Sequence, residues 1–75
     1  MKEEFQLLMT EELKIARSKH ANLNSFHEGY SVILEELDEL WEEIKKKSSL
    51  RDRALLQSEL IQVAAMCQRF YEDLL

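Results

Sequence analysis

Carboxylates at helical spacing are the side chains of this chain that could do chemistry. Residues 33–44 read ILEELDELWEEI, with six acidic side chains in twelve positions. Glu36 and Glu39 are three residues apart, so in a helix they share one face and can reach a common ion. Glu59 could join them from a facing helix. Oxygen ligands of this kind suit hard divalent cations, Mg²⁺ or Mn²⁺.

Glu59 is the most informative of these acids, because solubility does not explain its position. It interrupts an apolar stripe formed by Leu55, Val63, Met66 and Phe70. A carboxylate buried without a partner is costly, so such a group implies a cation, a hydrogen-bond network or a metal ion. In a helical bundle, ligands that project inward from facing helices are an established way to build a metal site.

Three helices must position these acids. The 3.6-residue periodicity predicts helices over about residues 2–19, 25–47 and 50–74. Ser25 and Glu28 have capping-box spacing at the start of the second helix, where Asn24 is the alternative cap. Ser49 is the candidate cap of the third helix, and Asp52 supplies the acidic residue that suits a first turn.

The second helix has three distinguishable faces. Its apolar stripe, which we expect to face the core, comprises Phe26, Ile33, Leu37, Leu40 and Ile44. The opposite face carries Glu35, Asp38 and Glu42, an arrangement typical of a solvated surface. A third set lies on the flank of the stripe, where a neighbouring helix would pack: Glu36, Glu39 and Glu43.

Size and composition predict an all-α, antiparallel three-helix domain over residues 1–75. The chain has 75 residues with no proline, one glycine and one cysteine, so few breaks interrupt its helices and no internal disulfide can form. Chains this small usually need a metal or self-association. The third helix is apolar on nearly all sides, so we expect it to pack against partner chains, and the domain to assemble into a larger helical bundle as a homodimer or homotetramer.

Charge and hydropathy exclude several classes of partner. The net charge of −5 argues against a nucleic acid polymer, whose phosphates need clustered basic residues. No apolar run approaches the length of a membrane span, and the start, MKEEF, lacks the pattern of a signal peptide. We therefore expect a cytoplasmic protein that does not enter a membrane.

The run VILEELDELWEEIKK, followed after a short joint by SELIQVAAMCQRF, resembles the MazG-type all-α nucleotide pyrophosphohydrolases. The signature of that family is EExxE on one helix and ExxD on the next. Glu35, Glu36 and Glu39 match the first element, and Glu59 with Gln62 occupies the second. The resemblance covers residues 26–75. The stretch KHANLNSFHEGYSVI is similar to small phage and bacterial proteins placed near this family.

The resemblance implies Mg²⁺-dependent hydrolysis of a nucleoside triphosphate to a monophosphate and pyrophosphate. Carried over, Glu36, Glu39 and Glu59 would be metal ligands, with Glu35 as a further ligand or the group that orients water. Gln62 stands where the family has an aspartate, and a neutral amide is a poorer ligand for a hard cation. The alternative is therefore a noncatalytic helical oligomer with a degenerate metal or nucleotide site, or an adaptor.

Several other polar residues could have either a structural or a functional role. Lys47 and Arg51 flank the second joint, where they either complement a helix dipole or contact the phosphates of a nucleotide. Glu12 interrupts the apolar stripe of the first helix and either faces the same polar centre or pairs with a cation of another chain. His20 and His27 match no zinc pattern, so capping or packing is the simpler role.

Overall fold

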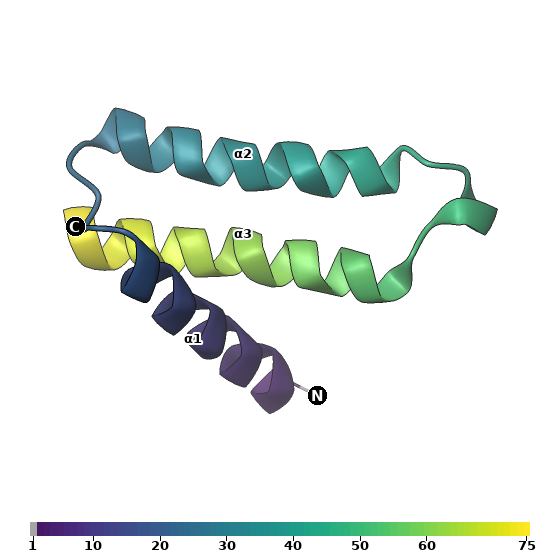
Figure 1. Cartoon of the computed structure of the whole chain (residues 1–75), viewed down its shortest axis with the longest axis horizontal. Coiled ribbons are helices and arrows are strands. Elements are labelled where there is room, and N and C mark those ends of the chain that lie inside the picture. Colours follow the sequence, from purple (N-terminus) through teal and green to yellow (C-terminus); the bar gives the residue numbers. More distant parts are fainter. Residues whose placement is uncertain (1) are drawn as a thin grey trace.

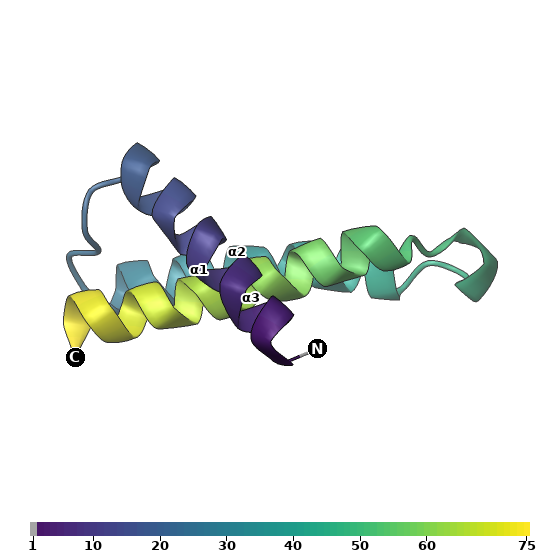
Figure 2. The ribbon, with the colours of Figure 1, turned by 90° about the horizontal axis from the view of Figure 1, so that it is seen from below.

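The computed structural model describes residues 2–75 as three helices and one short 3₁₀ turn. Helix α1 spans Lys2–Lys19, α2 spans Phe26–Ile44, and α3 spans Arg53–Leu74, while the turn, η1, is Ser48–Leu50. α2 and α3 run antiparallel, side by side along their length, and α1 packs obliquely against α3 (Figures 1 and 2). Residues 2–75 contain no strand, so the predicted all-α class is confirmed.

Helix α3 is the central element, because it packs against both other helices. The backbones of α1 and α2 do not approach each other within the described chain, since α1 diverges from the hairpin of α2 and α3 (Figure 1). Every helix along residues 2–75 is too short or too polar to serve as a membrane span.

The start of α2 follows the predicted capping pattern. The backbone N–H of Glu28 donates to Ser25 Oγ over 3.0 Å, which confirms Ser25 as the N-cap. The Glu28 carboxylate reaches back one residue further than in a standard capping box and accepts from the N–H of Asn24 over 2.6 Å. Two backbone donors at this helix start are therefore satisfied by side chains.

The predicted boundaries around the second joint are wrong by about three residues on each side. α2 ends at Ile44 rather than residue 47, because Arg51 Nε donates to the Ile44 carbonyl over 2.8 Å and takes the place of a further helical turn. α3 begins at Arg53 rather than residue 50. Its N-cap is Asp52, not Ser49, since the Asp52 carboxylate accepts from the N–H groups of Ala54 and Leu55.

The buried core is small and consists of short or flexible side chains. Ala16 of α1 and Ala65 and Met66 of α3 form its centre. Half-buried residues pack around them: Met9, Leu13, Val32 and Ile33. No side chain among the described residues with a large apolar volume is fully buried, so this chain alone gains little hydrophobic stabilisation.

Helix α2 is rotated away from the predicted orientation. The expected core stripe is only partly covered. Phe26 is 58% exposed, Leu37 43% and Ile44 38%, whereas Ile33 and Leu40 are half-buried and Ile33 packs against the core. The face turned toward α3 instead carries buried Gly29 and Glu43. Close approach explains the rotation at one end, because the Phe70 ring occupies the space that a side chain at position 29 would fill.

Glu43 fixes the other end of the α2–α3 hairpin. Its carboxylate is almost fully buried, pairs with Lys46 Nζ over 2.7 Å and accepts from the N–H of Asp52 over 2.8 Å. These two bonds lower the pKa of Glu43, the Lys46 contact contributing most. The residue is therefore a structural carboxylate that ties the end of α2 to the start of α3.

A second polar network fixes the joint between α1 and α2. Asp73 of α3 accepts from the N–H of Leu23 over 2.8 Å and pairs with Arg17 of α1 over 2.9 Å. Arg69, also buried, donates to the Ala21 carbonyl over 2.8 Å. The Leu23 bond, followed by the Arg17 contact, lowers the pKa of Asp73. This network holds residues 20–24 against the C-terminal half of α3.

Candidate metal centre

Three carboxylates meet where the middle of α2 faces the first half of α3. Glu36 and Glu39 project from α2 and Glu59 from α3, and one oxygen of each lies within 4.8 Å of the others. We call these three residues the acidic cluster. Its span is close to the roughly 4–5 Å that separates opposite oxygen ligands across a single Mg²⁺ or Ca²⁺. One ion could therefore contact all three side chains.

No member of the acidic cluster forms an ion pair within residues 2–75. Glu36 and Glu59 are half-buried, and the Oε2 atom of each is shielded from solvent with no hydrogen-bond partner. The two lysines that directly follow α2, Lys45 and Lys46, pair with Glu42 and Glu43 instead. Such uncompensated carboxylates are costly unless a cation or a proton neutralises them.

Protonation is the way in which the cluster relieves this cost without a cation. Burial raises the pKa of Glu36 from 4.5 to about 7. The negative charge of Glu39, a side-chain hydrogen bond with Glu39, and the charges of Glu59 and Glu35 add to that rise. Burial also raises the pKa of Glu59, with further contributions from the Glu39 and Glu43 carboxylates. A divalent cation placed between the oxygens would act in the opposite direction and favour the ionised forms.

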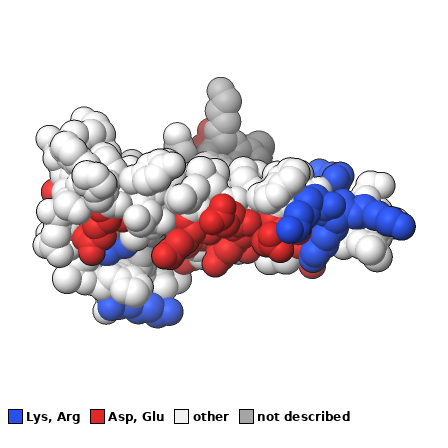
Figure 3. All heavy atoms as spheres, turned by 90° about the horizontal axis from the view of Figure 1, so that it is seen from above, with Lys and Arg blue, Asp and Glu red and all other residues white. Residues whose placement is uncertain are grey.

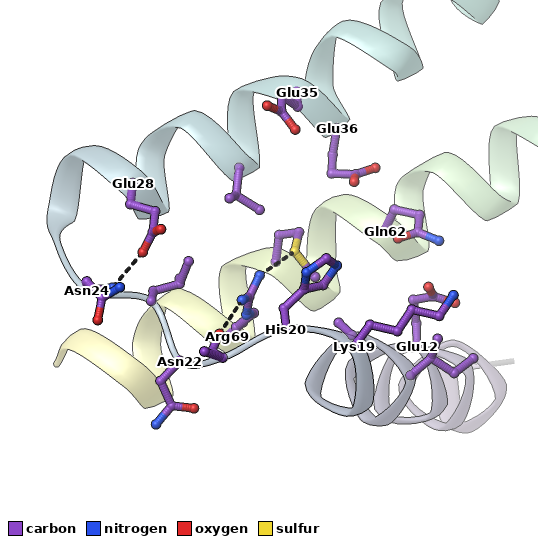
Figure 4. Close-up of a pocket in the computed structure, with 16 residues that line it drawn as sticks. Glu12, Lys19, His20, Asn22, Asn24, Glu28, Glu35, Glu36, Gln62 and Arg69 are labelled. Carbon is purple, nitrogen blue, oxygen red and sulfur yellow. Dashed lines mark hydrogen bonds between the residues drawn. The ribbon is translucent and has the colours of Figure 1, made fainter.

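A cavity of about 450 Å³ lies beside the cluster, in the space between α1 and α2. Glu36 belongs to both the cluster and the cavity wall. Figure 4 shows Glu35 and Glu36 entering from α2, Gln62 from α3, and Glu12 and His20 from α1 and the residue that follows it. The joint between α1 and α2 closes one end of the cavity. The acidic cluster therefore lies at the edge of a space large enough for an organic ligand.

Glu35 and Gln62, two other predicted site residues, line this cavity. Glu35 is exposed and precedes Glu36 on α2, so its carboxylate lies near the cluster without belonging to it. Gln62 is half-buried on α3, three residues after Glu59, and faces the cavity. The structure thus brings together five of the seven predicted site residues, and the metal-ligand and catalytic roles of all five stay predictions.

The remaining two predicted site residues, Lys47 and Arg51, lie beyond the C-terminal end of α2, in the joint that leads to α3. Both are exposed, and the basic side chains of this region gather beyond the acidic stretch of α2 (Figure 3). Neither residue is among those that line the cavity, whereas Lys19 is. Within one chain, Lys19 is therefore better placed than Lys47 or Arg51 to meet an anion bound there.

The sequence left the roles of Glu12, His20 and His27 open, and the structure places only the first two at the cavity. Glu12 is half-buried and His20 is exposed, and both line the cavity with Glu36. The prediction that Glu12 faces the same polar centre as Glu59 agrees with this position. His27 is exposed and lies outside the cavity wall. The predicted solvated face of Glu35, Asp38 and Glu42 is confirmed, since all three are exposed.

Sequence reasoning missed the buried residues that position the site. Arg69 and Asp73 are oppositely charged and four residues apart, a spacing that could have marked them as a pair on one face of α3. Glu43 was predicted to lie with Glu36 and Glu39 on the flank where a neighbouring helix packs, and its burial agrees with that position, but its bonds to Lys46 and Asp52 were not predicted. Comparison of the chain with protein-family models, with curated proteins and with solved structures finds no match.

Proposed function

We propose that this chain is a MazG-like nucleotide pyrophosphohydrolase that uses Mg²⁺ or Mn²⁺ to hydrolyse a nucleoside triphosphate to a monophosphate and pyrophosphate. One observation carries the proposal: three carboxylates from two helices converge within 4.8 Å with two shielded oxygens that have no partner. A divalent cation would satisfy those oxygens, whereas an ordinary solvated acidic face would not leave them unpaired.

The acidic cluster would hold the cation, and its residues fit that role. They provide oxygen donors on two rigid helices, with Glu39 exposed at the open side where waters and phosphate oxygens could complete the coordination. When bound, the ion supplies charge neutralisation for the phosphates and helps to generate the attacking water. Glu35, exposed at the adjoining cavity edge, is placed to orient that water or to accept its proton.

The cavity would receive the nucleoside part of the substrate. Its wall shares Glu36 with the cluster, so a ligand whose phosphates meet the cation would extend into this space. Amide side chains of Asn22, Asn24 and Gln62 offer donors and acceptors around the wall, and Lys19 offers a positive charge. Phosphate contact by Lys47 and Arg51 stays a prediction, because it requires those residues to come from another chain or to move.

Release of pyrophosphate with matched variants tests the proposal. The parent protein should convert a nucleoside triphosphate to the monophosphate and pyrophosphate with Mg²⁺, and Glu59→Gln should abolish this. Glu42→Gln is the control, because it also removes one negative charge, but at an exposed position of α2 outside the cluster. Equal rates for Glu59→Gln and Glu42→Gln would exclude the acidic cluster from the reaction.

A noncatalytic helical oligomer is the second candidate, and Gln62 is the observation that favours it. An amide faces the cavity where a carboxylate would strengthen the binding of a hard cation. If the parent is inactive and Gln62→Asp gains activity, the natural chain is a binding or adaptor protein. Self-association through the third helix as a homodimer or homotetramer, and a cytoplasmic location, stay predictions under either function.

A further inference from the structure

Arg69 is a buried cation whose hydrogen-bonding capacity is largely unused. The residue is only 6% exposed. Its Nη2 donates to the Ala21 carbonyl over 2.8 Å, whereas the acceptor of Nη1 is the Met66 sulfur, 3.9 Å away and weak. Nε is shielded from solvent and has no hydrogen-bond partner among residues 2–75. A guanidinium carries several N–H donors, and in Arg69 one of its three nitrogens meets a good acceptor within the described chain.

The ion pair with Asp73 does not satisfy these donors. Arg69 Nε lies 3.9 Å from the Asp73 carboxylate, which is beyond hydrogen-bond distance. That carboxylate is already engaged by the N–H of Leu23 over 2.8 Å and by Arg17 over 2.9 Å. A buried donor without an acceptor destabilises the fold. The unmet donors of Arg69 therefore point to an acceptor that the chain itself does not supply.

Arg69 borders the cavity of about 450 Å³ at the end closed by the joint between α1 and α2. It shares this end of the wall with His20, Asn22 and Asn24. Figure 4 shows Arg69 beside these residues and away from Glu36, which marks the end near the acidic cluster. A ligand that fills the cavity thus meets a guanidinium that is anchored by one good bond and still has donors to offer.

Distance along α3 decides which part of a nucleotide would meet Arg69. Glu59 of the acidic cluster and Arg69 are ten residues apart, about 15 Å along the helix axis. When the triphosphate binds a cation at the cluster, the part of the molecule farthest from the phosphates lies at Arg69. That part is the base. The inference drawn from this position rests on the proposed function.

We propose that Arg69 selects the substrate by its base and favours oxo bases, guanine and uracil or thymine, over the amino bases adenine and cytosine. A guanidinium only donates hydrogen bonds. Guanine and thymine present a carbonyl oxygen where adenine and cytosine present an amino group, which also donates. Two donors that face each other both stay unpaired, and this disfavours the amino bases.

Binding of four triphosphate analogues to the intact chain tests this selection. An imido group between the α and β phosphorus atoms blocks the release of pyrophosphate. With Mg²⁺ present, isothermal titration calorimetry should give dissociation constants about ten times lower for the GTP and UTP analogues than for the ATP and CTP analogues. In Arg69→Lys this difference should largely disappear, while the affinity for inorganic tripolyphosphate, which has no base, should stay the same.

Arg17→Lys is the matched control. Arg17 pairs with Asp73 and Glu72 in the same polar network as Arg69, but it is not among the residues that line the cavity. This variant should therefore keep the base preference of the parent, and circular dichroism establishes that both variants are folded. Equal affinities of the parent for the four analogues overturn the inference even if Arg69→Lys does not fold. A preference that survives in folded Arg69→Lys also overturns it.

Failure of this inference and failure of the proposed function give different results. A parent that releases pyrophosphate from all four triphosphates and binds their analogues equally keeps the function and overturns the selection by Arg69. A parent that prefers the GTP and UTP analogues and loses this preference in Arg69→Lys, but releases no pyrophosphate, supports the selection and refutes the catalysis. A parent that binds none of the analogues overturns the inference.

Discussion

Replacing Glu36 by glutamine should make the protein more stable at pH 8 and leave its stability nearly unchanged at pH 4. The folded protein raises the pKa of this carboxyl from 4.5 to about 7, chiefly through burial and then through the charges of Glu39, Glu59 and Glu35. Between those two pH values the folded chain binds more protons than the unfolded chain. The free energy of unfolding therefore falls as the pH rises from about 4.5 to about 7.

The size of the effect follows from the size of the pKa shift. A rise from 4.5 to about 7 corresponds to at most about 3 kcal/mol at pH values above 7. Because Glu36 is only half-buried and lies beside an exposed glutamate, solvent screening reduces the expected difference to about 1–2 kcal/mol. Glutamine keeps the shape of the side chain but cannot ionise, so the variant should lack this loss of stability.

Urea denaturation followed by circular dichroism, in EDTA and at one protein concentration, measures the difference. Parent and Glu36→Gln curves should separate progressively between pH 4.5 and 7 and then run parallel. Glu42→Gln should follow the parent, because Glu42 is exposed. If Glu36→Gln follows the parent at every pH, or is less stable at pH 8, the carboxylate is not held in an unfavourable environment and the reasoning is refuted.

Three other predictions rest on separate parts of the structure. Asp52→Ala should lower the free energy of unfolding by about 1 kcal/mol in urea titrations, since the N-cap of α3 loses both of its acceptor bonds. Glu43→Gln should lower the Tm at pH 7, and the variant should lose less stability than the parent as the pH falls. The lowered pKa of Glu43 gives the parent stability that is present above pH 4.5 and lost as the carboxylate is protonated. Mg²⁺ at about 100 times its dissociation constant should add about 2.7 kcal/mol to the free energy of unfolding of the parent, measured in urea, and nothing to that of Glu39→Gln. An Asp52→Ala protein as stable as the parent, a Glu43→Gln protein with an unchanged acid limb, or equal Mg²⁺ effects in parent and Glu39→Gln would each contradict the corresponding argument.

Periodicity and capping chemistry predicted most of the helical framework. The bounds of α1 and the Ser25 cap of α2 are confirmed, because both depend on local spacing along one helix. The cap of α3 was misplaced by three residues. Ser49 and Asp52 are both suitable cap residues, and the choice between them depends on Glu43 and Arg51, which bind the backbone of this joint from other positions in the chain.

The rotation of α2 could not be obtained from the apolar pattern. A helix with one apolar stripe and one flank of mixed residues can pack either face against the rest of its chain. Hydropathy alone predicts that the apolar stripe is the buried face. In the structure the absence of a side chain at Gly29 lets the Phe70 ring approach, and Glu43 finds two partners at the other end, so the mixed flank turns inward. The Gly29–Phe70 contact joins residues far apart in sequence, and the Glu43 bonds depend on the path of the joint that follows α2.

Convergence of the acidic cluster was predictable in part. The three-residue spacing of Glu36 and Glu39 places both on one face, and the apolar surroundings of Glu59 indicate a position between helices. The adjoining cavity was not predictable, because it arises from the divergence of α1 from α2. Its wall depends on the joint that Arg69 and Asp73 hold in place.

Anomalous diffraction from crystals soaked in Mn²⁺ measures whether Glu36, Glu39 and Glu59 bind a divalent cation. We expect one anomalous peak between their three carboxylates, which should be absent from crystals of Glu59→Gln grown and soaked in the same way. A parent crystal with no peak at this position, or with the Glu59 carboxylate turned to a lysine or arginine, would contradict the assignment of these residues to a metal centre.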